Sequence, residues 1–210
     1  MNELWNLGVV FTSAALDSNM VRVQEIAGRE QLGRLYEFRV RFSVATGQLE
    51  GAEIDKVLAL PCSFTFGHGA DEIVHGVVRE LELVESLDGR SAVYVATVVP
   101  SVWLLTLSRV SRVFQHMTVT EMAAEILTRF GLSGERDFAI RVFGKLEKRE
   151  FCVQYEESDW DFLQRWFEHE GLYYWFEHSD EGEKLVIADA IRPRRPSRAM
   201  RACPTASRRT

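Results

Sequence analysis

The chain has 210 residues, of which 46% are hydrophobic and 27% are charged. It is long enough for one large or two small globular domains with a substantial core, and its composition excludes a disordered protein. The cysteines, Cys62, Cys152 and Cys203, are too far apart for a disulfide framework or a Cys-x-x-Cys metal site. A reducing compartment fits best, and no secretory leader is expected after Met1.

Charge is distributed unevenly along the chain. The segment Ala190–Thr210 holds seven arginines and no acid, so removing it changes the net charge from −6 to −13. The acidic remainder lacks the lysine and arginine that phosphate contacts need, which disfavours nucleic-acid binding. The tail shows no hydrophobic periodicity and has too little apolar area to offset its ordering entropy, which predicts disorder.

The first hundred residues have the pattern of antiparallel β-structure. From Tyr36 to Val44, apolar and polar side chains alternate with the period of two that a half-buried strand shows. A short helix is expected at Ala52–Leu58. The other predicted strands are Met20–Ile26, Cys62–Phe66, Ile73–Glu85 and Ser91–Val99. The last two are expected to form a hairpin, because Asp88-Gly89 between them suits a tight turn. Together they indicate an antiparallel barrel or sandwich.

The uncharged run from Ser91 to Ser108 has the length of a membrane span. Pro100 interrupts it, and serine and threonine side chains are scattered through it. This favours a buried strand, a turn and a helix over a membrane span.

Two helices with start and stop signals follow. Thr118 and Glu121 form a capping box for the first, and Gly131 is placed to close it. Ser158, with Asp161 three residues on, caps the second. The second helix ends at Gly171 and carries a stripe made of Phe162, Leu163, Trp166 and Phe167. The strands expected around the helices are Phe138–Phe143, Phe151–Tyr155, Leu172–Glu177 and Leu185–Ala188.

No pattern in the chain indicates catalysis. Asp159 and Asp161, like Glu168 and Glu170, stand two apart on a helix and point about 200° from each other, so they cannot converge on one bond. Glu157 shares a face with Asp161, but capping and the helix dipole explain both. The histidines have no metal-ligand spacing and no phosphate loop or nucleophile elbow is present, so no catalytic, cofactor or metal residue is predicted.

The aromatic residues of 151–176 lie among acidic side chains, which is unfavourable for stacking nucleic-acid bases. Many carboxylates surround them, with Arg149 and Arg165 as the only basic residues nearby. A stripe at helical spacing is better explained as core, with Trp and Tyr reaching an interface. The residues alone therefore indicate an acidic α+β module used for assembly or binding.

Segment 151–176 also resembles the hallmark segment of the type VI secretion spike family VgrG, or Rhs element Vgr family. In that family a strand ending in Q-Y-x-E-S precedes D-x-x-F-L-x-R and then E-x-E-G-[IL]-x-Y-x-F. The matching positions are Gln154, Tyr155, Glu157, Ser158, Asp159, Phe162, Leu163, Arg165, Glu168, Glu170, Gly171, Leu172, Tyr174 and Phe176.

Further patches match this family in order over nearly all of Asn6–Asp189. Gly28–Phe42 is similar to its early strand entry, Val74–Val78 to its H-G-[IV]-V strand, and Val98–Leu127 to its P-x-x-W-L-L…S-R-[IV]-F-Q segment. The signature residues that these patches add, all taken as structural, are His75, Gly76, Trp103, Arg112 and Phe114.

The resemblance implies an α+β fold, with mainly antiparallel β-barrel subdomains of the phage tail hub type and inserted helices. We expect a first barrel at 1–100, a helix-containing part at 101–189 and a disordered tail at 190–210. It also implies a non-enzymatic homotrimer that docks on Hcp tube rings and delivers effectors. Such a protein is made in the bacterial cytoplasm and secreted at the tip of the injection apparatus.

The chain departs from the family after Asp189. Family members continue into the rest of the hub, an OB-fold neck and a β-helix, whereas this sequence turns arginine-rich, which suggests a frameshift or a truncated copy. The alternatives are a hub of a phage tail or another contractile injection system, a non-functional truncated copy and, third, a hydrolase using the acidic helix.

Overall fold

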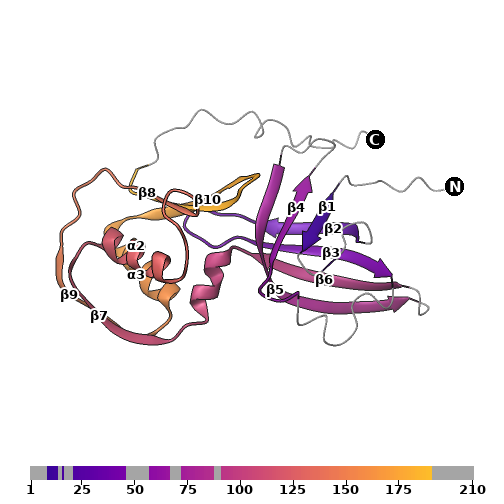
Figure 1. Ribbon diagram of the computed structural model, residues 1–210, viewed down its shortest axis with the longest axis horizontal. Coiled ribbons are helices and arrows are strands. Elements are labelled where there is room, and N and C mark those ends of the chain that lie inside the picture. The colour runs from indigo at the N-terminus through magenta and orange to yellow at the C-terminus, as the bar shows by residue number, and fades with distance from the viewer. Residues whose placement is uncertain are drawn as a thin grey trace, which may run out of the picture.

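The computed structural model describes residues 9–13, 16, 21–45, 57–66, 72–87 and 91–190. A six-stranded sheet forms one end of an elongated molecule, and two helices with shorter strands around them form the other end (Figure 1). The six strands are β1 (Val10–Ser13), β2 (Arg22–Arg29), β3 (Glu37–Ala45), β4 (Pro61–Phe66), β5 (Glu72–Leu87) and β6 (Ser91–Val99). All pair antiparallel in the order β1-β4-β5-β6-β3-β2. The edge strands β1 and β2 approach each other, so the sheet curls into a half-barrel.

Alternation along the strands gives the half-barrel its core. In β3, Val40, Phe42 and Val44 are buried and the residues between them are not, as period-two patterning predicts. They pack with apolar side chains of β1, β4, β5 and β6. Strand β2 pairs antiparallel with β3, and the predicted hairpin of β5 and β6 is confirmed.

The uncharged run around Pro100 is a core strand followed by a short helix. In β6 every residue from Ala92 to Val99 is buried, which confirms the predicted strand. After Pro100 the chain forms the 3₁₀ helix η2 (Ser101–Thr106). Within the described ranges, no helix combines the length and the apolar character needed to cross a bilayer.

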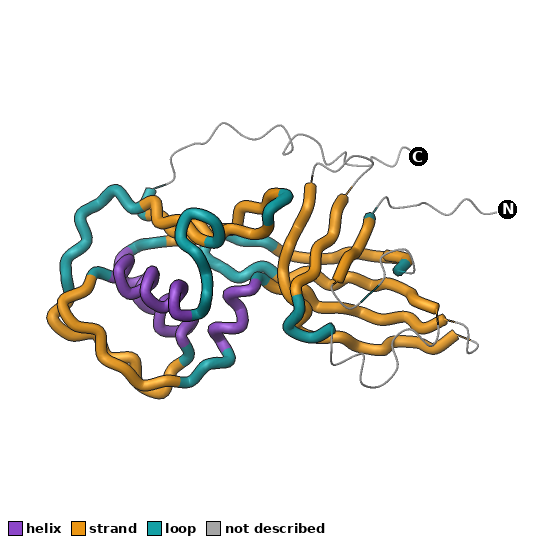
Figure 2. The backbone as a smooth tube through the Cα atoms, viewed as in Figure 1, coloured by secondary structure: helices purple, strands orange, loops and turns teal. Residues whose placement is uncertain are grey.

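The other end of the molecule is built from two small sheets and two α-helices (Figure 2). Strand β8 runs parallel to β11 in a sheet ordered β10-β11-β8, and β7 pairs antiparallel with β9. The elements are β7 (Val110–Met117), α2 (Val119–Arg129), β8 (Phe138–Arg141), β9 (Arg149–Glu157), α3 (Asp159–Glu170), β10 (Tyr173–Ser179) and β11 (Gly182–Ala188). Only β7 among these was not predicted from the sequence.

The helix ends form where the sequence indicates them. Thr118 and Glu121 make both hydrogen bonds of a capping box on α2. Ser158 caps α3, and Gly171 ends it in the left-handed conformation at φ 69°. A residue with a Cβ is strained at that angle, so glycine suits the position.

Some expectations fall on residues outside the described ranges. These are most of the helix expected at Ala52–Leu58, the turn at Asp88-Gly89 and the tail after Ala190; the described residues Val57–Leu60 form a turn. The domain boundary near residue 100 stays a prediction. The expected fold class, α+β with mainly antiparallel strands, is confirmed.

Candidate functional site

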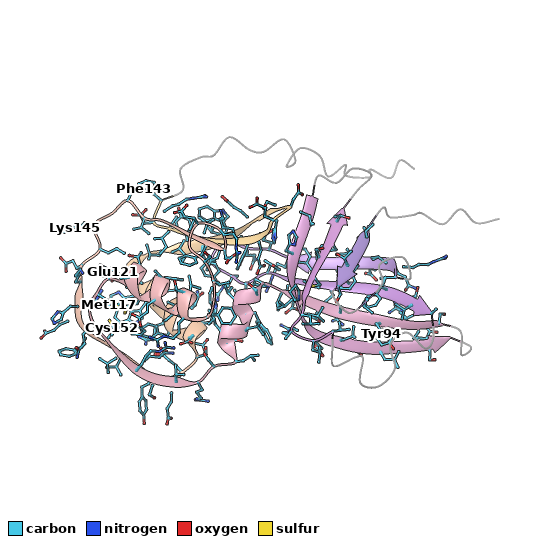
Figure 3. All side chains as sticks on the ribbon, in the orientation of Figure 1. Tyr94, Met117, Glu121, Phe143, Lys145 and Cys152 are labelled. Atoms are coloured by element: carbon cyan, nitrogen blue, oxygen red, sulfur yellow. The ribbon has the colours of Figure 1, made fainter. Side chains whose placement is uncertain are left out.

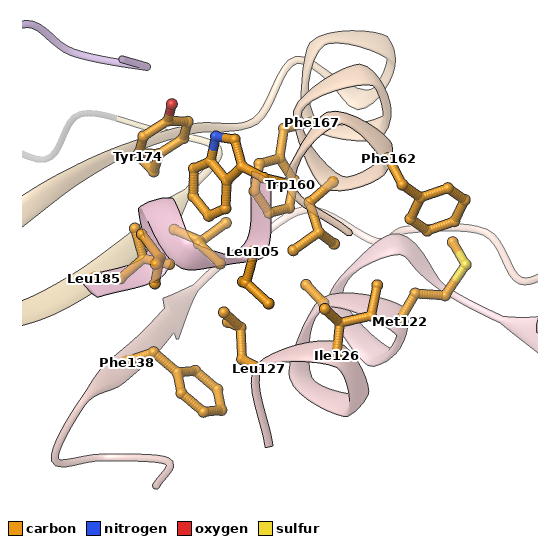
Figure 4. Close-up of a cluster of buried hydrophobic side chains, with 14 of the residues drawn as sticks. Leu105, Met122, Ile126, Leu127, Phe138, Trp160, Phe162, Phe167, Tyr174 and Leu185 are labelled. Carbon is orange, nitrogen blue, oxygen red and sulfur yellow. The ribbon is translucent and has the colours of Figure 1, made fainter. Parts of the chain in front are cut away.

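The aromatic segment folds as β9, α3 and β10 and supplies much of the core around α2 (Figure 4). Phe162 and Phe167 of α3 are at most 1% exposed. The Phe162 ring stacks on Phe114 of β7 with centroids 5.2 Å apart, and Trp160 meets Tyr174 of β10 edge-on at the same distance. The faces of these rings are therefore occupied by packing, which leaves no platform there for a base.

Neighbouring strands hold the acidic start of α3. The Asp159 carboxylate pairs with Arg112 of β7 and accepts a hydrogen bond from the Gln154 amide at 2.9 Å. The Ser158 hydroxyl accepts from the Asp161 N–H at 3.0 Å and donates to the Asp161 carboxylate at 2.7 Å. Both aspartates thus fix the helix start, where the helix dipole favours negative charge.

The acids that flank α3 are engaged by the two arginines singled out in the sequence. Arg165 pairs with Glu157 at 2.6 Å, and Arg149 pairs with Glu170. Their guanidinium groups lie over the Trp166 ring, 5.5 Å and 4.9 Å from its centroid. The hydrogen bond to Glu170 raises the pKa of Arg149. These carboxylates have structural partners, and the arrangement offers no facing pair for acid–base chemistry.

About half of the signature residues are buried. Tyr155, by contrast, is 71% exposed and points away from the core. The buried members are Gly76, Phe114, Gln154, Ser158, Phe162, Leu163, Leu172, Tyr174 and Phe176. The half-buried members are His75, Trp103, Arg112, Glu157, Asp159 and Glu170, and the exposed ones are Tyr155, Arg165, Glu168 and Gly171.

A second cluster, which we call the joint, connects the half-barrel to the β10–β11 hairpin. It consists of Tyr36, His75, Ser101, His178 and Glu183. The Tyr36 hydroxyl contacts a Glu183 carboxylate oxygen and the His75 carbonyl oxygen, and the other Glu183 oxygen accepts from the Ser101 N–H at 2.5 Å. The His75 N–H donates to Nδ1 of His178 at 3.3 Å, and the His75 ring nitrogen Nε2 lies 2.8 Å from the Ser179 carbonyl oxygen.

Gly76 allows the strands to close around the joint. A Cβ at this position would lie 2.5 Å from the Val99 carbonyl oxygen, 2.9 Å from Val98 Cγ1 and 3.2 Å from the Tyr36 hydroxyl. Any larger residue therefore has to push β6 and Tyr36 away. This gives a physical reason for glycine after His75 in the H-G pair.

Burial dominates the electrostatics of the joint. It raises the pKa of Glu183 and raises that of Tyr36 well above its ordinary value. Burial, followed by the neighbouring His75, lowers the pKa of His178 to about 4. Nε2 of His178 has no hydrogen-bond partner among the described residues. Tyr36 has one proton for two acceptors, so its hydroxyl cannot donate to the His75 carbonyl oxygen and to the Glu183 carboxylate at the same time.

A cavity of about 260 Å³ adjoins the joint and is lined in part by Cys62, His75 and Glu183. Burial and then the Glu183 charge raise the pKa of Cys62 to about 12, so its sulfur stays a thiol and is a poor nucleophile. In the described part of the chain, no three His, Cys, Asp or Glu side chains are placed to hold a metal ion. The joint therefore has the geometry of a connection between elements.

Sequence reasoning identified His75 and Gly76 but missed the other members of the joint. Tyr36 and Glu183 are separated by 147 residues, and His75 and His178 by 103. No local spacing links residues so far apart. The available signal was a glutamate, Glu183, two residues before the apolar strand predicted at Leu185–Ala188.

The curled antiparallel sheet with helices inserted after it is the architecture of phage tail hub proteins. The family described as "Phage tail baseplate hub (GPD)" matches residues 29–210. The chain belongs to this family.

Relatives connect the chain to type VI secretion. It is 33% identical over 187 residues to the type VI secretion system spike protein VgrG1a of Pseudomonas aeruginosa, a match that spans 87% of this chain and 28% of VgrG1a. The fold is similar to that of E. coli c3393, described as a type VI component with structural similarity to T4 tail proteins gp27 and gp5 (TM-score 0.77, 25% identity, 85% of this chain and 48% of that one). A prophage tail protein from Shewanella oneidensis shares the fold at 16% identity (TM-score 0.57, 85% of this chain and 52% of that one). The predicted spike-family resemblance and the hub-type fold are thus confirmed.

Proposed function

We propose that the chain serves as a hub part of a type VI secretion spike, without enzymatic activity, and that it works as a homotrimer docked on Hcp tube rings. The observation that carries this is the 33% identity to a spike protein over 87% of the chain. The carboxylates around α3 and the buried joint are engaged in structural contacts, which supports a mechanical role.

The fold suits this role because it combines a curled sheet with a tightly packed helical half. The joint couples the two, so that load applied to one is passed to the other through buried contacts. The chain would be made in the cytoplasm and leave the cell with its effectors at the tip of the apparatus. The chain spans about a quarter of VgrG1a, so docking and delivery belong to the proposal.

A chimera tests this function. Residues 9–189 replace the matched part of VgrG1a in a strain that lacks its own VgrG1a, and release of Hcp into the medium is measured. Restored release supports the spike assignment. No release from a chimera that is folded and expressed contradicts it, and a matched chimera carrying Phe162→Asp shows the background.

A tail hub of a phage or another contractile system is the second candidate, because prophage tail proteins share the fold. The same chimera separates the two, since a phage-specific hub does not restore Hcp release. A truncated copy without function would also fail, but it would fail in a phage tail assembly assay as well.

A further inference from the structure

The β10–β11 hairpin extends beyond the sheet that supports its base. Strand β8 pairs with β11 from Leu185 to Ala188. Residues 178–183, which we call the hairpin tip, form a two-stranded ribbon beyond that pairing. A two-stranded ribbon is marginally stable by itself. The position of the hairpin tip therefore depends on its contacts with the half-barrel.

Two hydrogen bonds hold the hairpin tip on β5, and both involve His75. The His75 N–H donates to Nδ1 of His178 at 3.3 Å. The His75 ring nitrogen Nε2 lies 2.8 Å from the Ser179 carbonyl oxygen. A carbonyl oxygen only accepts, so Nε2 is the donor, and the His75 ring makes this bond in its neutral and its protonated form alike. On the other strand of the hairpin tip, Glu183 contacts the Tyr36 hydroxyl.

The bond to His178 forms in one protonation state only. Because Nδ1 accepts, the single proton of the neutral ring is on Nε2, which has no hydrogen-bond partner among the described residues. An imidazolium carries a proton on both nitrogens, so its Nδ1–H would face the His75 N–H, donor against donor. A charged ring with unpaired donors is costly in a partly buried site. Protonation of His178 therefore breaks this contact with β5.

The charged groups around His178 do not replace the lost bond. Glu183 is its cross-strand partner, and both of its carboxylate oxygens are engaged in other contacts. Burial raises the pKa of Glu183, so acid also removes its negative charge. A protonated His75 adds a like charge, and Glu177 lies on the opposite face of β10, paired with Arg141. Other ionisable side chains around the joint are Glu30, Tyr36, Cys62, Asp180 and Glu181.

We propose that the hairpin tip is a proton-operated lid: protonation of His178 releases it from β5 and opens the cavity beside the joint. The cavity, of about 260 Å³, is lined by residues 181–183 of the hairpin tip and, from the half-barrel, by Cys62 and His75. With the lid closed, Cys62 is 5% exposed. The lid acts within one chain, so it does not depend on the spike assignment.

The base of the hairpin keeps its supports when the lid opens. The Tyr174 carbonyl oxygen accepts from the Gly33 N–H at 2.8 Å, and β11 pairs with β8 beyond the hairpin tip. In the open lid the pKa of His178 returns to about 6.5, and in the closed lid it is about 4. The opening constant should therefore rise about 20-fold between pH 7 and pH 5.

The reactivity of Cys62 toward 4,4′-dithiodipyridine, a reagent that labels thiols in mild acid, reports the opening. The full 210-residue chain carries Cys203→Ser, and peptide mass spectrometry assigns the label to Cys62 or Cys152. Cys152 is 2% exposed and lies at the opposite end of the molecule from Tyr94 of the half-barrel (Figure 3). It reacts when the whole chain unfolds, so the ratio of the two rates separates lid opening from global unfolding.

The expected result is a Cys62 rate that exceeds the Cys152 rate and rises about 20-fold from pH 7 to pH 5, relative to a free thiol at each pH. In His178→Asn the side-chain oxygen accepts the His75 N–H without titrating, so the Cys62 rate should change less than about twofold. His169→Asn, a substitution outside the joint, should behave like wild type.

Three results would overturn the proposal. Cys62 labelled no faster than Cys152 would mean that global unfolding alone exposes it. An equal rise in wild type and His178→Asn would exclude His178 as the group that opens the lid. Labelling of Cys62 at the free-thiol rate already at pH 7 would show that the cavity is always open. The first and third comparisons use the His178-containing chain alone, so they decide the matter even if His178→Asn fails to fold.

Discussion

Replacing His178 by asparagine tests whether the joint depends on a buried neutral imidazole. In the folded chain the pKa of His178 is lowered to about 4, because burial penalises the charged form and His75 lies beside it. In the unfolded chain the ring titrates near its ordinary value of about 6.5. Below that pH the unfolded state binds the proton first, so the folded state loses stability as pH falls from 6.5 toward 4.

The magnitude follows from the two pKa values. At pH 7 both states are nearly neutral at His178, and the contribution to the free energy of unfolding is close to zero. At pH 5 the unfolded ring is almost fully protonated and the folded ring is not, which costs about 2 kcal/mol. The full cost, reached below pH 4, is about 3 kcal/mol. Glu183 has the opposite effect: because its pKa is raised in the folded chain, acidification increases the free energy of unfolding. Wild type and His178→Asn both keep Glu183, so the difference between them reports on His178 alone.

Urea unfolding at pH 7 and pH 5 gives the required free energies. The side-chain oxygen of His178→Asn still accepts the His75 N–H but does not titrate, so this variant should lose about 2 kcal/mol less than wild type between the two pH values. His169→Asn is the control, since His169 stacks on Trp166 of α3, outside the joint. Equal losses in wild type and His178→Asn would refute the reasoning.

Three other substitutions test the packing by the same urea assay. Glu183→Gln should raise the free energy of unfolding by about 1 kcal/mol at pH 7, because it removes a buried charge and supplies a donor for the Tyr36 oxygen. If the variant keeps the same gain in stability at pH 4, burial of the charge is not its cause. Gly76→Ala should cost about 2 kcal/mol or more, whereas Gly134→Ala, where the nearest atom to a new Cβ is 3.7 Å away, should stay within about 0.5 kcal/mol. Phe162→Ala should cost about 3–5 kcal/mol, and a loss below 1 kcal/mol would mean that the aromatic segment is not the core.

Local signals in the sequence predict the helix ends and most of the strands correctly. Capping depends on residues three positions apart, so Thr118 with Glu121 and Ser158 with Asp161 are readable without tertiary information. The joint depends on contacts between residues more than a hundred positions apart. Such contacts exist only after the sheet and the hairpin are in place, and no period in the sequence encodes them.

Strand β9 has a second feature that the sequence pattern leaves open, namely which of its two faces points inward. A period of two separates Phe151, Val153 and Tyr155 from Cys152 and Gln154 but does not say which set points inward. The more hydrophobic set should be the buried one, yet Cys152 and Gln154 face the core. The orientation is fixed elsewhere, by the Gln154 amide on Asp159 and by the Ser158 cap that starts α3 at once after the strand.

The inner residues of β9, Cys152 and Gln154, pack against the core, whereas Phe151, Val153 and Tyr155 lie exposed on the other face. The hydrophobic pattern therefore predicts that β9 alternates, and the contacts of its neighbours determine which set of side chains lies inside.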